Sequence, residues 1–482
     1  MTNGINCGKV LFIGRNFLRF ILLVAAVLSG LASIATAELS ATQRDLVARR
    51  ACEAAIWAMP AVAAYDIELA LQRDAGAAPG VVGYMSAPMD ARHGFLTAND
   101  VTPYTFTGLT TKDGPIVIEV PTAGNKAAFF GTIVYALQVP IADVGTSGED
   151  AGAGAKYLIL PPGYDGEVPQ EGFIVHKSNT FGVHFAFRPV AKNGGTHSDQ
   201  AAYAQLLQWY PFSESDNPPP TEFVDTKVNP VNTLPVYDMT YFTDMNAVIQ
   251  REPVLEQDKV MMAMLASLGM VKGEPFEPDA ELQSALLDGL ACAYDYLQDV
   301  FVTEGGGFKK IWDDRQWGAF AINPEQAKQG FPFVSDTEVL VDQRAAQYFY
   351  LTYLPKNLGG GTFYLGGLRD SNGDMLNGAD TYKLTVPANT PAEDFWSVIV
   401  YSMETKGFVQ GGERVGLATP NLPDMKVNDN GSADVFFAPT APEGMESNWI
   451  PTGEDFFLLF RLYGPSAGWL ESGWKLPDLE KQ

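Results

Sequence analysis

The sequence contains few of the residues from which metal centres and catalytic triads are usually built. Among its 482 residues are four histidines and three cysteines. No Cys or His cluster has the spacing of a zinc site, so we predict no metal site, and the sequence indicates no particular cofactor. Basic residues are also scarce, because 32 Lys and Arg stand against 57 Asp and Glu, which gives a net charge of −25. Such a surface repels phosphate backbones and argues against nucleic acid as a partner.

Only the N-terminus contains a long apolar run. A basic start precedes an uncharged stretch at residues 20–31, and Ala35-Thr36-Ala37 then places small residues where signal peptidase requires them. This order is typical of a secretory signal peptide, and the run is too short for a stable membrane span. We expect residues 1–37 to be removed and the mature protein to be periplasmic or secreted, with no membrane span.

Two cysteines, Cys52 and Cys292, remain after the predicted cleavage. In an oxidising compartment they could form a disulfide bond, and two buried free thiols fit their small, apolar surroundings equally well. The sequence leaves both alternatives open. The mature chain is long enough for two or three domains, each with its own core.

The residue patterns change along the chain and predict a mainly β, multidomain protein. Helical patterns alternate with β-prone runs that are separated by Pro, Gly, Asn and Asp. The predicted parts after the signal peptide are an N-terminal helical segment at 38–78, a β-sandwich at 79–235, a helical subdomain at 236–334 and a jelly-roll-sized sandwich at 335–482.

Two local features lead to specific structural predictions. Ser40 and Gln43 resemble a capping box that opens a helix, and Pro60 is expected to kink this helix or end its first half. Residues 172–190 are expected to form a hairpin that turns near Asn179.

In that hairpin a three-residue loop would place His176 opposite His184, close enough to share a metal or a proton. Another loop length would separate them, and the simpler alternative is two strand histidines with local hydrogen bonds.

Several stretches resemble two families whose function is unknown. The C-terminal third is similar to DUF1214 at residues 378–387, 395–401, 448–451 and 456–465 (the last reads FFLLFRLYGP). The N-terminal part is similar to DUF1254 at residues 99–104, 114–121 and 157–163 and at Arg188. The resemblance implies an immunoglobulin-like sandwich, a small helical subdomain and a C-terminal jelly roll. It implies no reaction.

The first functional hypothesis is an exported hydrolase that acts on a sugar-like, ester or sulfate substrate between the two β domains. Asn99, Asp100, Tyr104, His184 and Arg188 are the candidate site residues, because they combine acid–base groups with an anion-binding cation. Asp100 or His184 would act as general base, Tyr104 as proton donor, and Asn99 and Arg188 would bind the substrate. His184 and Arg188 are four residues apart on one predicted strand and therefore share a face.

The second hypothesis is a non-catalytic envelope protein that binds a carbohydrate or a protein partner through aromatic surfaces. The sequence contains 8 Trp, 19 Tyr and 29 Phe residues, and exposed aromatic rings on a sheet can stack on sugars. Separation of the candidate residues on different surfaces would favour this alternative, and their convergence would favour the enzyme. The sequence does not indicate the oligomeric state.

Overall fold

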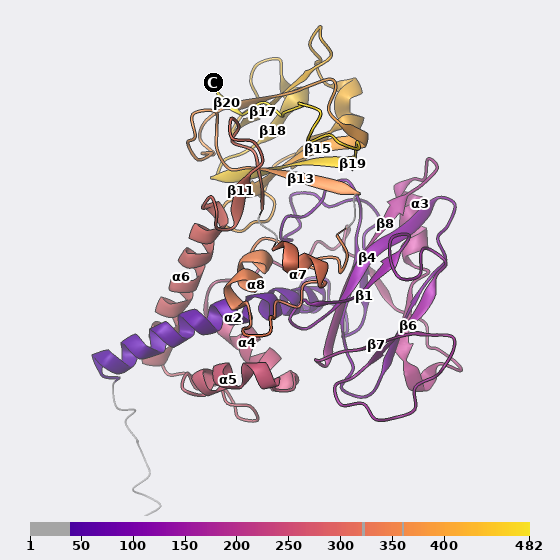
Figure 1. The fold of residues 1–482 in the computed structure, drawn as a ribbon, viewed down its shortest axis with the longest axis vertical. Helices are drawn as coiled ribbons and strands as arrows, with labels where there is room; N and C mark the ends of the chain where they lie inside the picture. Colours follow the sequence, from indigo (N-terminus) through magenta and orange to yellow (C-terminus); the bar gives the residue numbers. More distant parts are fainter. Residues whose placement is uncertain (1–38, 321–322, 359–360) are drawn as a thin grey trace, which may run out of the picture. The chain divides into compact units, whose positions relative to one another are not determined.

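The computed structural model describes residues 39–320, 323–358 and 361–482 (Figure 1). The predicted signal peptide at residues 1–37 lies outside them. The chain divides into two units, residues 1–46 and residues 47–482. The β sheets described below all belong to the second unit. The predicted fold class, a multidomain β protein with sandwich-like sheets and a helical region, is confirmed.

The first helix, α2 (Ala41–Arg73), begins with the predicted capping box. The Ser40 N–H donates to Gln43 Oε1 at 2.9 Å, and the Gln43 N–H donates to the Ser40 hydroxyl at 3.3 Å. Pro60 does not end the helix. It lies in a buried stretch, and its carbonyl accepts a hydrogen bond from Gln138 Nε2. By length and composition α2 is the one described helix that could cross a membrane, and 83% of its most apolar window is buried in the protein.

The N-terminal β domain consists of two sheets. Sheet A has the strand order β10-β1-β2-β8-β4-β5, and sheet B has the order β7-β6-β3-β9. The strands of sheet A are β1 (Val82–Tyr84), β2 (Thr105–Thr110), β4 (Ala127–Tyr135), β5 (Pro140–Gly145), β8 (Gly182–Ala191) and β10 (Phe223–Asp225). The strands of sheet B are β3 (Ile116–Val120), β6 (Ala155–Leu160), β7 (Ile174–Lys177) and β9 (Gln208–Pro211).

Sheets A and B enclose one apolar core. Alternating residues of each strand point inward, among them Phe129, Phe185 and Phe187 from sheet A and Ile118 and Ile159 from sheet B. The helix α3 (His197–Ala204) packs against β4 and β8. The residues that alternate with this core set lie on the other face of sheet A, which we call its outer face.

The C-terminal β domain is a second sandwich, drawn in orange and yellow in Figure 1. Sheet C has the order β11-β12-β13-β19-β15-β16, and sheet D has the order β18-β17-β14-β20. The strands of sheet C are β11 (Phe308–Lys310), β12 (Gly318–Phe320), β13 (Thr362–Gly367), β15 (Ala392–Ser402), β16 (Gly416–Ala418) and β19 (Phe456–Pro465). The strands of sheet D are β14 (Tyr382–Val386), β17 (Ala433–Ala438), β18 (Trp449–Pro451) and β20 (Glu480–Lys481).

The central strand β19 is buried on both of its faces, from Phe456 to Tyr463. Leu458 and Phe460 point into the core between sheets C and D. The residues that alternate with them point to the outer face of sheet C, toward the N-terminal β domain. Burial on two sides explains why the sequence of β19 is almost continuously apolar instead of alternating.

Helices follow the N-terminal β domain in the sequence, in part interleaved with the first strands of sheet C. They are α4 (Met239–Arg251), α5 (Lys259–Ala266), α6 (Ala280–Val302), α7 (Pro324–Lys328) and α8 (Val341–Tyr348). One face of α6 is apolar and packs inward, because Leu286, Leu290, Ala293 and Leu297 are all buried.

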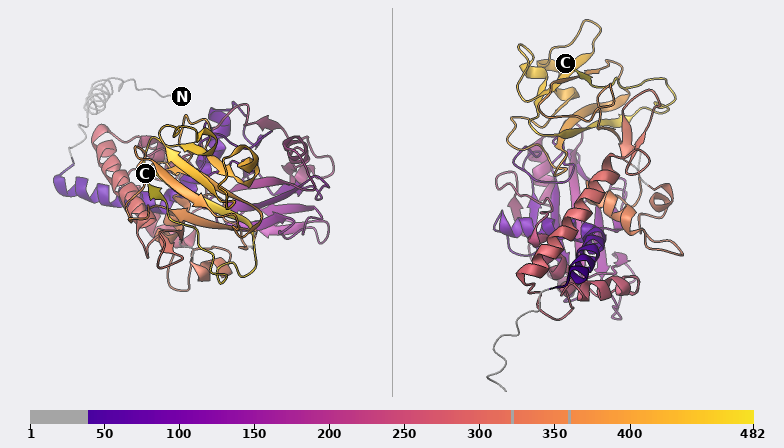
Figure 2. Two further views of the ribbon diagram at one scale, coloured as in Figure 1. Left: turned by 90° about the horizontal axis from the view of Figure 1, so that it is seen from above. Right: turned by 90° about the vertical axis from the view of Figure 1, so that its left-hand side faces the viewer.

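A disulfide bond connects α2 with α6, which run close to each other in both views of Figure 2. Cys52 and Cys292 are 240 residues apart in the sequence, and their Cα atoms are 5.6 Å apart. The helices approach closely at Gly289, where a Cβ atom would lie 2.5 Å from that of Ala51. Of the two alternatives that the sequence left open, the structure contains the disulfide.

The hairpin predicted at residues 172–190 is wrong. β7 pairs with β6 in sheet B, whereas β8 pairs with β2 and β4 in sheet A. The Ser178 hydroxyl donates to the Thr180 carbonyl at 2.6 Å within the segment that crosses between the sheets. His176 therefore lies 2.9 Å from a Glu149 oxygen, far from a pairing with His184.

Candidate functional site

A polar cluster lies where the outer face of sheet A meets the outer face of sheet C. β8 of sheet A and β13 and β19 of sheet C are the main strands involved (Figure 1). We call this group the Arg–Tyr cluster. Its members are Asn99, Asp100, Tyr104 and Arg188 from the N-terminal β domain and Tyr364, Arg461 and Tyr463 from the C-terminal β domain.

Arg188 is the central residue of the cluster on sheet A. Its neighbours Phe185 and Phe187 anchor β8 in the sandwich core, and strand alternation places Arg188 on the outer face. Its guanidinium carbon lies 4.9 Å from the ring centroid of Tyr104, a cation–π contact. On the other side Arg188 lies directly opposite Phe130 of β4. The guanidinium thus rests on the Tyr104 ring, and Phe130 is its neighbour on the adjacent strand.

Arg461 is the corresponding residue on sheet C. It lies opposite Tyr364 of β13 and opposite Ser397 of β15. Its guanidinium carbon is 5.0 Å from the Tyr364 ring centroid and 5.6 Å from that of Tyr401. Tyr463 stands two residues further along β19 and shares this face.

The loop before β2 joins the two domains at the cluster. One nitrogen of Arg461, Nη2, donates to the carbonyl oxygens of Thr97 and Ala98 at 3.1 and 3.3 Å. Asn99 Nδ2 donates to the Tyr463 hydroxyl at 2.8 Å. Because these bonds tie a loop of the first domain to a strand of the second, they fix the relative position of the residues that form the cluster.

Arg461 has unused hydrogen-bonding capacity. It is 1% exposed, yet its Nε and Nη1 atoms have no hydrogen-bond partner within the described ranges. Burial opposes its charge, but the neighbouring tyrosines outweigh this and raise the pKa, so the guanidinium stays protonated. A buried donor without a partner costs about 1–3 kcal/mol. These Nε–H and Nη1–H groups point to different sides of the planar guanidinium, and each is a charge-assisted donor suited to an oxyanion.

Asp100 reaches the same place from the other domain. Its carboxylate lies against the backbone of Gly416 in β16, where a Cβ atom would be only 2.9 Å from Oδ2. Oδ1 is buried and has no partner in the described part of the chain. Loss of hydration raises the pKa of Asp100 to about 6, although the charge of Arg461 opposes the rise. A carboxyl group in this range can exchange protons near neutral pH.

Tyr364 differs from the other tyrosines of the cluster. It is 39% exposed, whereas Tyr463 is 8% exposed. Desolvation raises the pKa of both phenols. In Tyr364 the charges of Arg188 and Arg461 outweigh desolvation and lower the pKa below its ordinary value, whereas the pKa of Tyr463 rises to about 12. Tyr364 is thus the accessible phenol and the better acid.

His184 lies on the outer face of sheet A but outside the cluster. It is four positions from Arg188, which corresponds to about 13 Å along a strand. It is completely buried and stacks on Tyr353 at 6.5 Å between ring centroids. Neither ring nitrogen has a partner among the described residues. Burial, aided by the charge of Arg251, lowers the pKa of His184 to about 3, so the ring is neutral at ordinary pH.

The structure therefore brings four of the five predicted site residues together and separates His184 from them. Sequence reasoning missed Tyr364, Arg461 and Tyr463. A signal for two of them was present, because Arg461 is the one charged residue in the apolar run of β19 and Tyr463 follows on the same face. Tyr364 carries no such signal.

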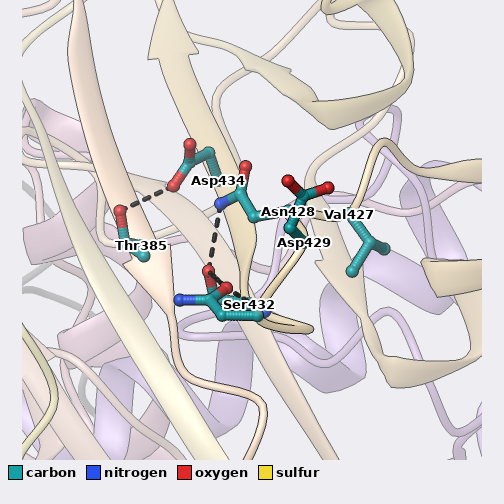
Figure 3. A pocket seen from close by; sticks show the side chains of 7 residues that line it. Thr385, Val427, Asn428, Asp429, Ser432 and Asp434 are labelled. Atoms are coloured by element: carbon teal, nitrogen blue, oxygen red, sulfur yellow. Dashed lines mark hydrogen bonds between the residues drawn. The ribbon is translucent and has the colours of Figure 1, made fainter.

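Elsewhere, a surface hollow lies beside the loop at residues 427–432 (Figure 3). Its polar groups bind one another: the Thr385 hydroxyl donates to Asp434, and Asn428 Nδ2 donates to the Ser432 hydroxyl. Among the described residues that line it, none is a buried, unpaired group like Arg461 that a ligand could bind. The described part of the chain contains no group of three or more His, Cys, Asp or Glu side chains placed to hold a metal ion.

Comparison with protein families matches two models. Residues 80–211 match a family described as a protein of unknown function, DUF1254, and residues 361–467 match another so described, DUF1214. The chain therefore contains a DUF1254 region followed by a DUF1214 region. The Arg–Tyr cluster of this DUF1254–DUF1214 protein draws residues from both matched regions.

No curated protein matches this chain. Among solved structures it is similar to the VPA0106 protein of Vibrio parahaemolyticus, with 16% identity and a TM-score of 0.52 over 91% of this chain and 100% of that one. It also aligns with an uncharacterized protein of Burkholderia cenocepacia, with 11% identity and a TM-score of 0.34 over 92% of this chain and 95% of that one. The first similarity concerns the fold alone.

Proposed function

We propose that this DUF1254–DUF1214 protein is an exported hydrolase that acts at the Arg–Tyr cluster on an ester, sulfate-ester or sugar-like substrate. The observation that carries the proposal is Arg461, a buried cation with two unpaired N–H donors next to an accessible phenol and a carboxyl group. Donors of this kind stabilise the oxyanion that develops when water attacks an acyl or sulfuryl centre.

The acid and the base of this reaction follow from the direction of the pKa shifts. Asp100, with a pKa of about 6, is mostly ionised at neutral pH and accepts a proton from the attacking water. Tyr364 acts in its protonated form, and the charges of Arg188 and Arg461, which lower its pKa, make it the better proton donor to the leaving oxygen. Afterwards the proton on Asp100 returns to Tyr364 through solvent. Arg461 donates hydrogen bonds to the oxyanion, and Arg188 binds a second oxygen of the substrate.

This assignment keeps Asp100 as the base expected from the sequence and gives the role of proton donor to Tyr364. The pKa of Tyr104 is raised by burial, and its ring lies against Arg188, so it serves to position that guanidinium. His184 has no part in the proposed reaction, because it lies outside the cluster.

Export is part of the same proposal. It is supported by the order of residues at the N-terminus and by the bond between Cys52 and Cys292, since disulfides persist in oxidising compartments. Fractionation of expressing cells, with N-terminal sequencing of the product, tests it. We expect a periplasmic or secreted protein that begins after Ala37, and an intact cytoplasmic chain would contradict export.

A panel of esters, sulfate esters and glycosides tests the activity on the purified mature protein. We expect Tyr364→Phe to lower kcat about 100-fold or more, because a positioned general acid contributes about 10²–10⁴-fold. Tyr296→Phe is the matched control, since Tyr296 is 37% exposed and lies on α6. The absence of turnover on all three substrate classes, or equal kcat for the two variants, would refute the proposal.

A further inference from the structure

Two apolar side chains are exposed directly beside Arg188. Phe130 of β4 lies opposite Arg188 of β8, and Val190 stands two residues after Arg188 on the same strand. All three side chains therefore share the outer face of sheet A. Phe130 is 39% exposed and Val190 is 37% exposed. Side chains opposite each other on neighbouring strands have Cβ atoms about 5 Å apart. We call Phe130 and Val190 the apolar shoulder.

The apolar shoulder continues the Arg–Tyr cluster on one side. Tyr104, directly before β2, contacts Arg188 of β8, and Phe130 of β4 lies opposite Arg188 on its other side. Tyr364, itself 39% exposed, is close enough to Arg188 for that charge to lower its pKa. The surface at this point therefore combines the partly exposed Arg188 guanidinium and the Tyr364 ring with the apolar side chains of Phe130 and Val190, whereas Arg461 is buried.

From this juxtaposition we infer that the substrate is amphiphilic, with an apolar chain that lies on Phe130 and Val190 and a head group that becomes an oxyanion held by Arg188 and Arg461. The inference rests on the proposed function and specifies its substrate: an ester whose acyl chain is apolar, so that hydrolysis releases a carboxylate with an apolar tail. Neither a purely polar sugar nor inorganic anions would cover the shoulder.

Binding of straight-chain carboxylates, as mimics of the released product, tests this without turnover. Isothermal titration of the mature protein would compare acetate, butyrate, hexanoate and octanoate. A fully buried CH₂ group contributes about fourfold in affinity, and on a half-exposed shoulder we expect the Kd to fall roughly twofold per CH₂. Octanoate should therefore bind about 50-fold more tightly than acetate.

Two variants separate the chain from the head group. Phe130→Ser should weaken octanoate binding about tenfold and leave acetate binding within about twofold, because Phe130 supplies apolar contact only. Val228→Ser is the control, since Val228 is 68% exposed and lies outside the cluster and the shoulder; it should change neither value.

The possible failures are distinguishable. Equal affinity for acetate and octanoate, or equal loss of both in Phe130→Ser, would overturn the amphiphilic substrate and leave the oxyanion site standing. Binding of 1-octanol as tight as that of octanoate would also overturn the inference, because the chain would then bind independently of the arginines. If neither acetate nor octanoate bound, the oxyanion site itself would be refuted, and the proposed function with it.

Discussion

Replacement of Asp100 by Asn should make the protein more stable at neutral pH and leave its stability at acid pH unchanged. Asn has the shape of Asp but cannot ionise. Asp100 lies against the Gly416 backbone, where loss of hydration raises the pKa of its carboxyl group from 3.8 to about 6. Below pH 3.8 the group is protonated in the folded and the unfolded protein and has no effect on stability.

As the pH rises above this value, Asp100 ionises more readily in the unfolded chain than in the folded protein, so the folded state loses stability. The loss grows to about 3 kcal/mol above pH 6, where both states are ionised. Because Asp100 keeps partial contact with solvent, this value is an upper bound. Asp100→Asn removes the loss and should therefore gain up to about 3 kcal/mol at neutral pH.

Urea denaturation of the mature wild type and of Asp100→Asn, measured between about pH 4 and pH 8, gives the free energies of unfolding. Asp165→Asn, at an exposed position on the loop after β6, is the control and should follow the wild type. A difference between Asp100→Asn and the wild type that does not vary with pH would refute the reasoning. The same variant should lose hydrolytic activity, so stability and activity should move in opposite directions.

Three further predictions concern groups outside the cluster. Asp66 and Asp244 are buried beside each other, and desolvation together with the charge of Asp244 raises the pKa of Asp66 to about 8. The free energy of unfolding of Asp66→Asn, measured by urea denaturation, should therefore rise by about 1–3 kcal/mol relative to the wild type as the pH rises from 4 to 8. No gain at pH 8 would contradict this. Removal of the disulfide by Cys52→Ala with Cys292→Ala should cost about 3–5 kcal/mol, because the bond closes a long loop in the unfolded chain. Addition of reductant should destabilise the wild type by the same amount and leave the double variant unchanged, and a reductant-insensitive wild type would argue against the bond. His184→Phe keeps the stacking on Tyr353 and removes an imidazole whose pKa is lowered to about 3. The free energy of unfolding of the wild type should fall by about 1–3 kcal/mol as the pH drops below about 6.5, because the unfolded chain takes up a proton that the folded protein does not. Melting curves at acid pH should show that the variant lacks this fall.

The sequence predicts much of this fold because the decisive signals are local. The strands around Phe185 and Phe460 and the apolar face of α6 follow from period and composition within one segment. The failed hairpin at residues 172–190 shows where local signals end: the turn chemistry near Asn179 fits a hairpin, but the partners of β7 and β8 are strands far away in the sequence. Which strands pair with each other depends on the core that the whole domain forms, and no single segment of sequence specifies that core.

The candidate site was predictable in part for the same reason. Asn99, Asp100 and Tyr104 are close in sequence, and Arg188 is a charged residue on an otherwise apolar strand. Their partners Tyr364 and Arg461 come from another domain, so only the assembled structure places them together. His184 illustrates the opposite error. It shares a face with Arg188, but residues four positions apart on one strand can belong to different sites.

Two guanidinium groups, of Arg188 and Arg461, act on the phenol of Tyr364 and lower its pKa. A spectrophotometric titration tests this most directly, by following the ultraviolet absorbance of tyrosinate in the mature wild type and in Tyr364→Phe, with Tyr296→Phe as control. We expect one tyrosine to ionise below the ordinary value of about 10, and we expect this step to be absent from Tyr364→Phe alone. Identical titration curves for the wild type and Tyr364→Phe below that pH would contradict the account.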